Sequence, residues 1–243
     1  MLIDNTFIFI SLPRCASTSF FVTCLKSNIP VEHFDSNSDN QLNGIDGWQT
    51  MDNELLADRL THNHEPLLDL TKKFGKNFPI ISIKRNKYER FLSLWKHIID
   101  ELFRIGQTEL ATTFTKLTID DIFYNITSND VINLEKKEII IDDFVNRFKI
   151  PKEKWYIRNM INILITPISE FTNNDPNIIW FDINNLSELE SWVSTKLDIQ
   201  FKLEKINSSQ KYNSTIIIDD IFKEKYDKIY SITENRKSNK TLL

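Results

Sequence analysis

The sequence predicts an α/β fold with a mostly parallel sheet covered by helices on both faces. Three short apolar runs, at residues 7–10, 80–84 and 177–181, have the length and the Ile and Phe content of buried strands. A segment with helical spacing of apolar residues follows each run. Strands that alternate with helices favour a parallel sheet, because parallel neighbours need a crossover connection between them.

The helix after the second strand is the most regular one, because Phe91, Trp95, Ile98 and Leu102 form one apolar stripe. The first helix is expected from Phe20 onward. The remaining elements are a strand at residues 30–34 and helices at 52–60, 66–74, 120–124, 141–148, 155–164, 186–197 and 218–232. Residues 35–47 and 201–213 are polar and predict exposed loops. Since no repeat and no Gly/Ser-rich or Pro-rich linker divides the chain, we expect a single domain over residues 1–243.

Composition limits the classes of partner. With 30 Lys and Arg against 34 Asp and Glu, the net charge of −4 argues against a protein that coats nucleic acid or an anionic membrane. Cys15 and Cys24 have neither metal-type spacing nor enough partners for a disulfide framework, and we expect reduced thiols. No run has the length of a membrane span, and no basic segment precedes a long apolar one. A cytoplasmic protein without a membrane partner is therefore expected.

Glycine is scarce. The chain has only 4 Gly, and their positions exclude both the dinucleotide fingerprint GxGxxG and the Walker A pattern. A nucleotide site, if present, must follow another plan.

The first strand leads into a loop and helix start rich in hydroxyl groups. This segment comprises Pro13, Arg14, Cys15, Ala16, Ser17, Thr18 and Ser19. A strand, a tight turn and a helix start in this order aim backbone N–H groups and hydroxyls at one point, which suits a phosphate or a sulfate. The alternative is an ordinary connection in which Ser17 or Thr18 only caps the helix.

A second strand, loop and helix contains Arg85-Asn86-Lys87-Tyr88-Glu89-Arg90-Phe91-Leu92-Ser93. Taken together, residues 13–19 and 85–93 resemble the motifs of the sulfotransferase superfamily, which uses the sulfate donor PAPS (3′-phosphoadenosine 5′-phosphosulfate). In that family the first motif surrounds the 5′-phosphosulfate. The leading Arg and the final Ser of the second motif hold the 3′-phosphate. The resemblance covers roughly the first hundred residues and is thin beyond them.

Two positions depart from the family pattern. Ala16 stands where glycine is usual, and alanine fits there if its φ is negative. Lys87 stands where proline is usual, and it remains compatible with a helix while adding positive charge. Arg14 suits the first motif, because a guanidinium contacts two oxygens at once.

The resemblance implies a three-layer P-loop-like fold and transfer of the sulfuryl group from PAPS to an acceptor hydroxyl, without a metal. The donor-binding residues that it implies are Arg14, Cys15, Ala16, Ser17, Thr18, Ser19, Arg85, Ser93 and Lys211. Arg14 has a catalytic role as well, because it would stabilise the charge that develops on the bridging oxygen. Lys211 belongs to residues 207–211, which are similar to a loop that folds over the nucleotide in many relatives.

A catalytic base is expected at His64. Residues 64–75 look like the segment that precedes the 3′-phosphate motif in carbohydrate 2-O-sulfotransferases, where that His is the proposed base. His62, Glu65 and Glu54 remain alternatives, and His62 and His64 are equally compatible with a polar turn. The same segment favours a saccharide hydroxyl as the acceptor.

Two other functions stay open. A small-molecule kinase follows the same strand–loop–helix plan but needs the Walker Lys, which this loop lacks. A non-catalytic anion- or glycan-binding module would keep the fold and bind PAP, the desulfated product, without transferring sulfate.

Overall fold

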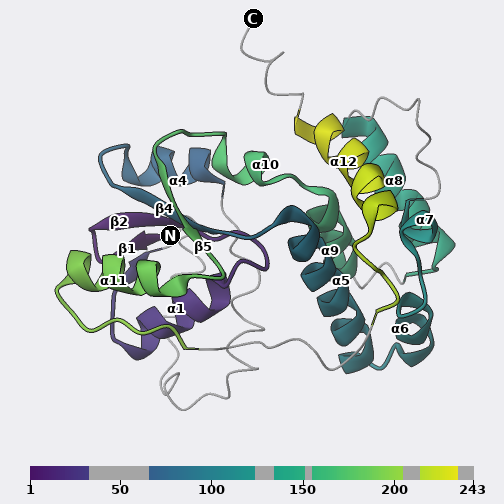
Figure 1. The fold of residues 1–243 in the computed structure, drawn as a ribbon, viewed down its shortest axis with the longest axis horizontal. Helices are drawn as coiled ribbons and strands as arrows, with labels where there is room; N and C mark the ends of the chain where they lie inside the picture. The colour runs from purple at the N-terminus through teal and green to yellow at the C-terminus, as the bar shows by residue number, and fades with distance from the viewer. Residues whose placement is uncertain (33–65, 124–133, 151–154, 205–213, 235–243) are drawn as a thin grey trace, which may run out of the picture. The chain divides into compact units, whose positions relative to one another are not determined.

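The computed structural model describes residues 1–32, 66–123, 134–150, 155–204 and 214–234. It shows an α/β protein with a five-stranded sheet flanked by helices (Figure 1). The chain divides into two compact units. Unit 1 comprises Met1–Arg85 and Ile168–Ser208, and unit 2 comprises Asn86–Pro167 and Ser209–Leu243. The single domain expected from the sequence stays a prediction.

The sheet of unit 1 has the strand order β3-β1-β2-β4-β5. Its strands are β1 (Leu2–Ile3), β2 (Phe7–Ile10), β3 (Val31–Glu32), β4 (Ile80–Lys84) and β5 (Ile178–Asp182). β2, β4 and β5 are parallel neighbours, whereas β1 pairs antiparallel with both β2 and β3.

The sheet is therefore mixed: among the described strands, β2, β3, β4 and β5 run in the direction of a parallel sheet, and β1 runs opposite to them. β1 is only two residues long, too short to be recognised from an apolar run. It reverses into β2 through Asp4 and Asn5, whose φ values are 45° and 50°. Asp and Asn tolerate this left-handed conformation better than most residues do, which allows the tight reversal.

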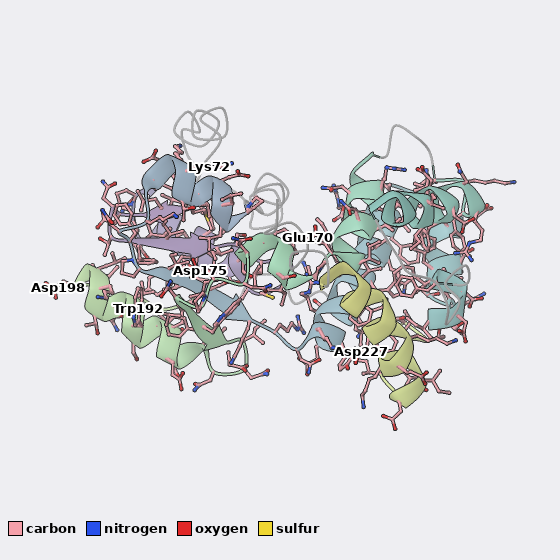
Figure 2. All side chains as sticks on the ribbon, turned by 90° about the horizontal axis from the view of Figure 1, so that it is seen from above. Lys72, Glu170, Asp175, Trp192, Asp198 and Asp227 are labelled. Carbon is pink, nitrogen blue, oxygen red and sulfur yellow. The ribbon has the colours of Figure 1, made fainter. Side chains whose placement is uncertain are left out.

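Aromatic side chains fix two helices on one face of the sheet. α1 (Ser17–Lys26) places the ring of Phe20 4.0 Å from the ring of Phe9 in a stacked pair. α11 (Leu186–Leu197) places Trp192 5.0 Å from Phe7 on the same face of β2. α4 (Leu67–Phe74) lies on the other side of the sheet from α11, as Lys72 and Trp192 show in Figure 2. The short helix α10 (Ile168–Thr172), which the sequence did not predict, completes unit 1.

In its described residues, unit 2 consists of helices around a second core. The helices are α5 (Lys87–Arg104), α6 (Thr108–Phe114), α7 (Ile119–Ile122), α8 (Leu134–Arg147), α9 (Trp155–Ile165) and α12 (Asp220–Glu234). The predicted stripe of α5 is buried, and its Trp95 stacks on Phe114 at 5.1 Å. This apolar cluster is separate from the one beneath the sheet of unit 1.

Most predicted boundaries differ from the observed ones by a few residues. α8 begins well before the predicted residue 141, and α7 and α12 are each shifted by up to two residues. The helix predicted at 52–60, the loop at 35–47 and most of the loop at 201–213 lie outside the described residues.

Candidate functional site

The candidate site lies where the two predicted motifs leave the sheet. β2 and β4 are parallel neighbours with Ile10 opposite Ser82, so the loops that follow them begin at the same edge. The buried hydroxyl of Ser82 donates a hydrogen bond of 2.9 Å to the Ile10 carbonyl and links the two strand ends. β2 and β4 lie next to each other in the sheet. The next described strand after β2 is β3, at one edge of the sheet, and the next described strand after β4 is β5, at the other edge. Open α/β sheets bind ligands at such a change of direction, outside the carboxyl ends of the strands.

The loop after β2 has an unusual backbone. Arg14 and Ala16 have φ values of 61° and 57°, and Cys15 lies between them. The loop is closed by a hydrogen bond of 3.2 Å from the Cys15 N–H to the Leu12 carbonyl. Left-handed residues in a tight turn direct successive N–H groups to one side, which produces a concave site for an anion.

Ala16 has a positive φ, so the condition under which alanine would fit here without strain is not met. The loop has the conformation that glycine adopts easily, and the Cβ of Ala16 opposes it, at a cost of about 1–2 kcal/mol. The departure from the family pattern therefore introduces backbone strain and leaves the glycine-like shape in place.

The N-terminus of α1 has no acidic residue in its first turn, and its N-cap residue, Ala16, makes no side-chain cap. The alternative interpretation had Ser17 or Thr18 capping this helix, but the Ser17 hydroxyl donates instead to the Leu12 carbonyl at 3.2 Å. The partial positive charge of a helix N-terminus attracts anions. The start of α1 thus has the properties of an anion site.

Arg85 connects the two motifs. It follows β4 directly, is half-buried, and its Nη1 donates to the Arg14 carbonyl at 3.3 Å. The hydrogen bond lies within unit 1. It places the guanidinium of the second motif at the loop of the first.

The remaining predicted site residues belong to unit 2 or lie outside the described residues. Ser93 is half-buried on α5 and belongs to unit 2, so its proximity to Arg85 stays a prediction. The candidate base His64, its alternatives His62, Glu54 and Glu65, and the donor contact Lys211 lie outside the described residues.

The start of α5 differs from the start of α1, because it has a side-chain cap and an acidic residue in its first turn. The Asn86 side chain caps the helix by accepting from the Tyr88 N–H, and Glu89 lies in the first turn. Lys87, considered above as extra positive charge, pairs with Asp227 of α12 at 2.7 Å. Burial by itself lowers the pKa of Lys87, but the hydrogen bond and charge of Asp227 outweigh it and raise that pKa. Lys87 is therefore charged but neutralised by its partner.

The two cysteines of the chain are both on the strand–loop–helix unit of the first motif. Cys15 and Cys24 are buried as thiols, and burial raises the pKa of Cys24 far above its usual range, which makes this thiol a poor nucleophile.

The part of the chain that the structure describes contains no group of three or more His, Cys, Asp or Glu residues arranged to hold a metal ion. Among the same residues, no helix is both long and apolar enough to cross a membrane.

Comparison of the chain with protein-family models, with curated protein sequences and with solved structures found no match.

Replacing Ala16 with glycine is expected to stabilise the protein by about 1 kcal/mol. The change removes the left-handed penalty of alanine, and the extra chain entropy of glycine in the unfolded state offsets part of that gain. Urea denaturation followed by circular dichroism measures the difference. Ala16→Val is the control, and it should destabilise because a β-branched residue tolerates positive φ worst. An Ala16→Gly protein no more stable than the parent would contradict the loop conformation.

Proposed function

We propose that the chain is a PAPS-dependent sulfotransferase that transfers the sulfuryl group to an acceptor hydroxyl, most simply on a carbohydrate. The observation that carries the proposal is the hydrogen bond from Arg85 to the Arg14 carbonyl, because it joins the two motifs on which the family resemblance depends. The proposal includes the three-layer P-loop-like fold and a cytoplasmic location.

The charge and shape of the loop support this choice of donor. A phosphosulfate is anionic, and the site offers it a concave turn, the N-terminus of a ten-residue helix and the guanidinium groups of Arg14 and Arg85. Hydrogen bonds to charged groups contribute about 1.5–3 kcal/mol each. Cys15, Ser17 and Ser19 are buried, whereas Arg14, Ala16 and Thr18 are half-buried. The half-buried residues would therefore contact the donor through their side chains. The buried residues would contact it mainly through their backbone N–H groups.

Each residue then has a distinct role. PAPS would supply the activated sulfuryl group when bound. Arg14 and the N–H groups of residues 15–19 hold the phosphosulfate and stabilise the negative charge that develops on the bridging oxygen during in-line displacement. Arg85 and Ser93 bind the 3′-phosphate, and Lys211 contacts the donor. His64 accepts the proton of the attacking hydroxyl.

Replacing Arg85 with alanine is expected to weaken PAP binding about tenfold to a hundredfold, because one charge-assisted contact to the 3′-phosphate is lost. Binding of ATP, which has no 3′-phosphate, should change much less. Isothermal titration calorimetry with both nucleotides measures the two effects. Arg104→Ala is the matched control, since Arg104 is a largely exposed arginine that pairs with Glu101. Equally weak binding of PAP and ATP to the parent protein would contradict the assignment of the donor.

A non-catalytic anion-binding module is the second candidate. The observation that favours it is that the assembled loop, within the described residues, contributes guanidinium, hydroxyl and N–H groups, which bind anions, and no carboxylate or imidazole base. PAP binding without sulfate transfer to any acceptor in a panel of saccharides and phenols would support this function over the enzyme.

A further inference from the structure

Among the described strands, the two edges of the sheet in unit 1 differ. At one edge, β3 is only two residues long, and its Glu32 pairs with Lys73 at 3.2 Å. At the other edge, β5 has five residues with the sequence IIWFD. A short strand, charged side chains and proline are the usual protection of a sheet edge against pairing with another chain. β3 is protected in this way, whereas β5 is longer and has a charge only at its last residue.

Two large apolar side chains of β5 are exposed. Ile179 is 40% exposed and Trp180 is 36% exposed. Successive side chains of a strand point to opposite faces of the sheet. The ring of Phe181 lies 6.0 Å from that of Trp192 on α11, so Ile179 is on the α11 face and Trp180 is on the other face. The edge therefore offers apolar surface on both faces.

The outer side of β5 presents the backbone groups of alternate residues. The Ile183 N–H donates to the Lys84 carbonyl at 3.0 Å, which shows that the odd-numbered residues direct their backbone groups to β4. Because the direction alternates along a strand, Ile178, Trp180 and Asp182 direct theirs outward. The N–H and carbonyl of Trp180 have no hydrogen-bond partner among the described residues.

Each end of this outer row has one group that the chain itself satisfies. The Ile178 N–H donates to the Asp175 carbonyl at 3.5 Å, and the Asp182 carbonyl accepts from the Asn185 N–H at 2.9 Å. In the described part of the chain, the Ile178 carbonyl and the Asp182 N–H have no such partner. The outer row thus offers an acceptor at Ile178, a donor and an acceptor at Trp180, and a donor at Asp182.

This row is complementary to itself. In an antiparallel pair centred on Trp180, the two Trp180 residues exchange two hydrogen bonds, and the Asp182 N–H of each copy meets the Ile178 carbonyl of the other. The two groups that the chain already satisfies face each other, so neither loses a partner. We propose that a second copy of this chain pairs along β5, so that a two-fold axis joins the two sheets into one.

The satisfied groups favour a second copy over an unrelated peptide. Any other extended strand in this register brings an N–H to the Asp182 carbonyl and a carbonyl to the Ile178 N–H, and both of its groups stay unpaired. Each unpaired backbone group removed from water costs about 1–3 kcal/mol. In the pair of copies, Ile179 lies opposite Phe181 of the second copy, which covers exposed apolar surface. No like charges lie opposite each other, because Asp182 faces Ile178.

The test is sedimentation velocity of the full chain, without any nucleotide. The dimer fraction of the parent should rise between about 10 µM and about 1 mM, as expected for an interface of small area. Trp180→Lys should raise the dissociation constant at least about tenfold, because it places two ammonium groups opposite each other. Leu68→Lys is the matched control. It makes the same change in charge at a 52% exposed apolar residue of α4 and should dimerise like the parent.

Hydrogen exchange followed by NMR tests the register of the pair. In the parent, the amides of Trp180 and Asp182 should exchange about tenfold more slowly when most of the protein is dimeric than when it is dilute. The amides of Ile178, Ile179 and Phe181 should change much less, because each already has a partner within the chain.

Three outcomes would overturn the proposal: a parent that stays monomeric at the highest concentration, a dimer that Leu68→Lys weakens as much as Trp180→Lys does, and a dimer in which exchange at Trp180 and Asp182 is unchanged. The last two place the contact elsewhere. Ile179→Lys, on the other face of β5, should also weaken the dimer, and it replaces Trp180→Lys if that variant fails to fold. None of these readouts depends on PAPS, so the dimer and the proposed function succeed or fail separately.

Discussion

Replacing Phe20 with alanine is expected to lower the free energy of unfolding by about 3–5 kcal/mol, the usual cost of deleting a buried aromatic ring. Phe20 is fully buried and stacks on Phe9, with further ring contacts to Phe7 at 6.5 Å and Phe201 at 5.5 Å. It joins α1, β2 and the chain after α11, so the cavity forms directly beneath the helix that begins at the candidate anion site. Urea denaturation followed by circular dichroism measures the loss.

The matched control is Trp95→Ala, in the separate core of unit 2. Trp95 is fully buried and stacks on Phe114, so a loss of similar size is expected. Native-state hydrogen exchange separates the two variants, because Phe20→Ala should deprotect amides of α1 and β2, and Trp95→Ala should deprotect amides of α5 and α6. A cost below about 1 kcal/mol for Phe20→Ala would contradict the packing of α1 on the sheet.

Replacing His64 with alanine is expected to reduce the rate of sulfate transfer about 10²–10⁴-fold, the typical contribution of a positioned general base. In the proposed mechanism, His64 removes the proton of the acceptor hydroxyl, while Arg14 and the N–H groups of residues 15–19 bind the donor. Single-turnover transfer of labelled sulfate from PAPS to a panel of saccharides measures the effect. Binding of PAP should be unaffected, which distinguishes a base from a donor contact.

His62→Ala and His97→Ala are the controls for this prediction. His62 lies two residues before His64, and His97 is half-buried on α5, so neither change should reduce transfer to the same extent. If the parent transfers sulfate and His64→Ala transfers it at the same rate, the base is not His64, and His62, Glu54 and Glu65 become the candidates. If the parent transfers no sulfate at all, the result favours the binding module.

Strands and amphipathic helices were predictable wherever local pattern decides structure. The apolar runs at residues 7–10 and 80–84 are strands with the predicted bounds, because four consecutive buried residues in each leave few alternatives. The stripe of α5 is buried as expected, since its spacing matches the helix period. The two-residue strand β1 and the short helix α10 were missed, because segments this short form through tertiary pairing and carry little signal of their own.

The chemistry of the loop was only partly predictable. The residue types of 13–19 indicated an anion site, but a sequence carries no φ values, so the left-handed turn at Ala16 could only be learned from the structure. Arg90 and Lys87 also look alike in sequence, as basic residues at a helix start. The fold buries Arg90 against the Thr166 carbonyl and pairs Lys87 with Asp227. Both partners are distant in sequence, so no local pattern could reveal them.

The sequence by itself determined the fold class, the strand–loop–helix order of both motifs and the residue types available to an anion, because these depend on local composition and periodicity. Tertiary structure alone decided that β2 and β4 are neighbours, that Arg85 reaches the Arg14 carbonyl, and that α1 starts without a side-chain cap. These features depend on which strands pair and on where the backbone turns. Strand pairing and backbone turns depend on the free energy of the whole folded chain. For this reason Arg14 and Arg85, which are 71 positions apart, contact each other at one edge of the sheet.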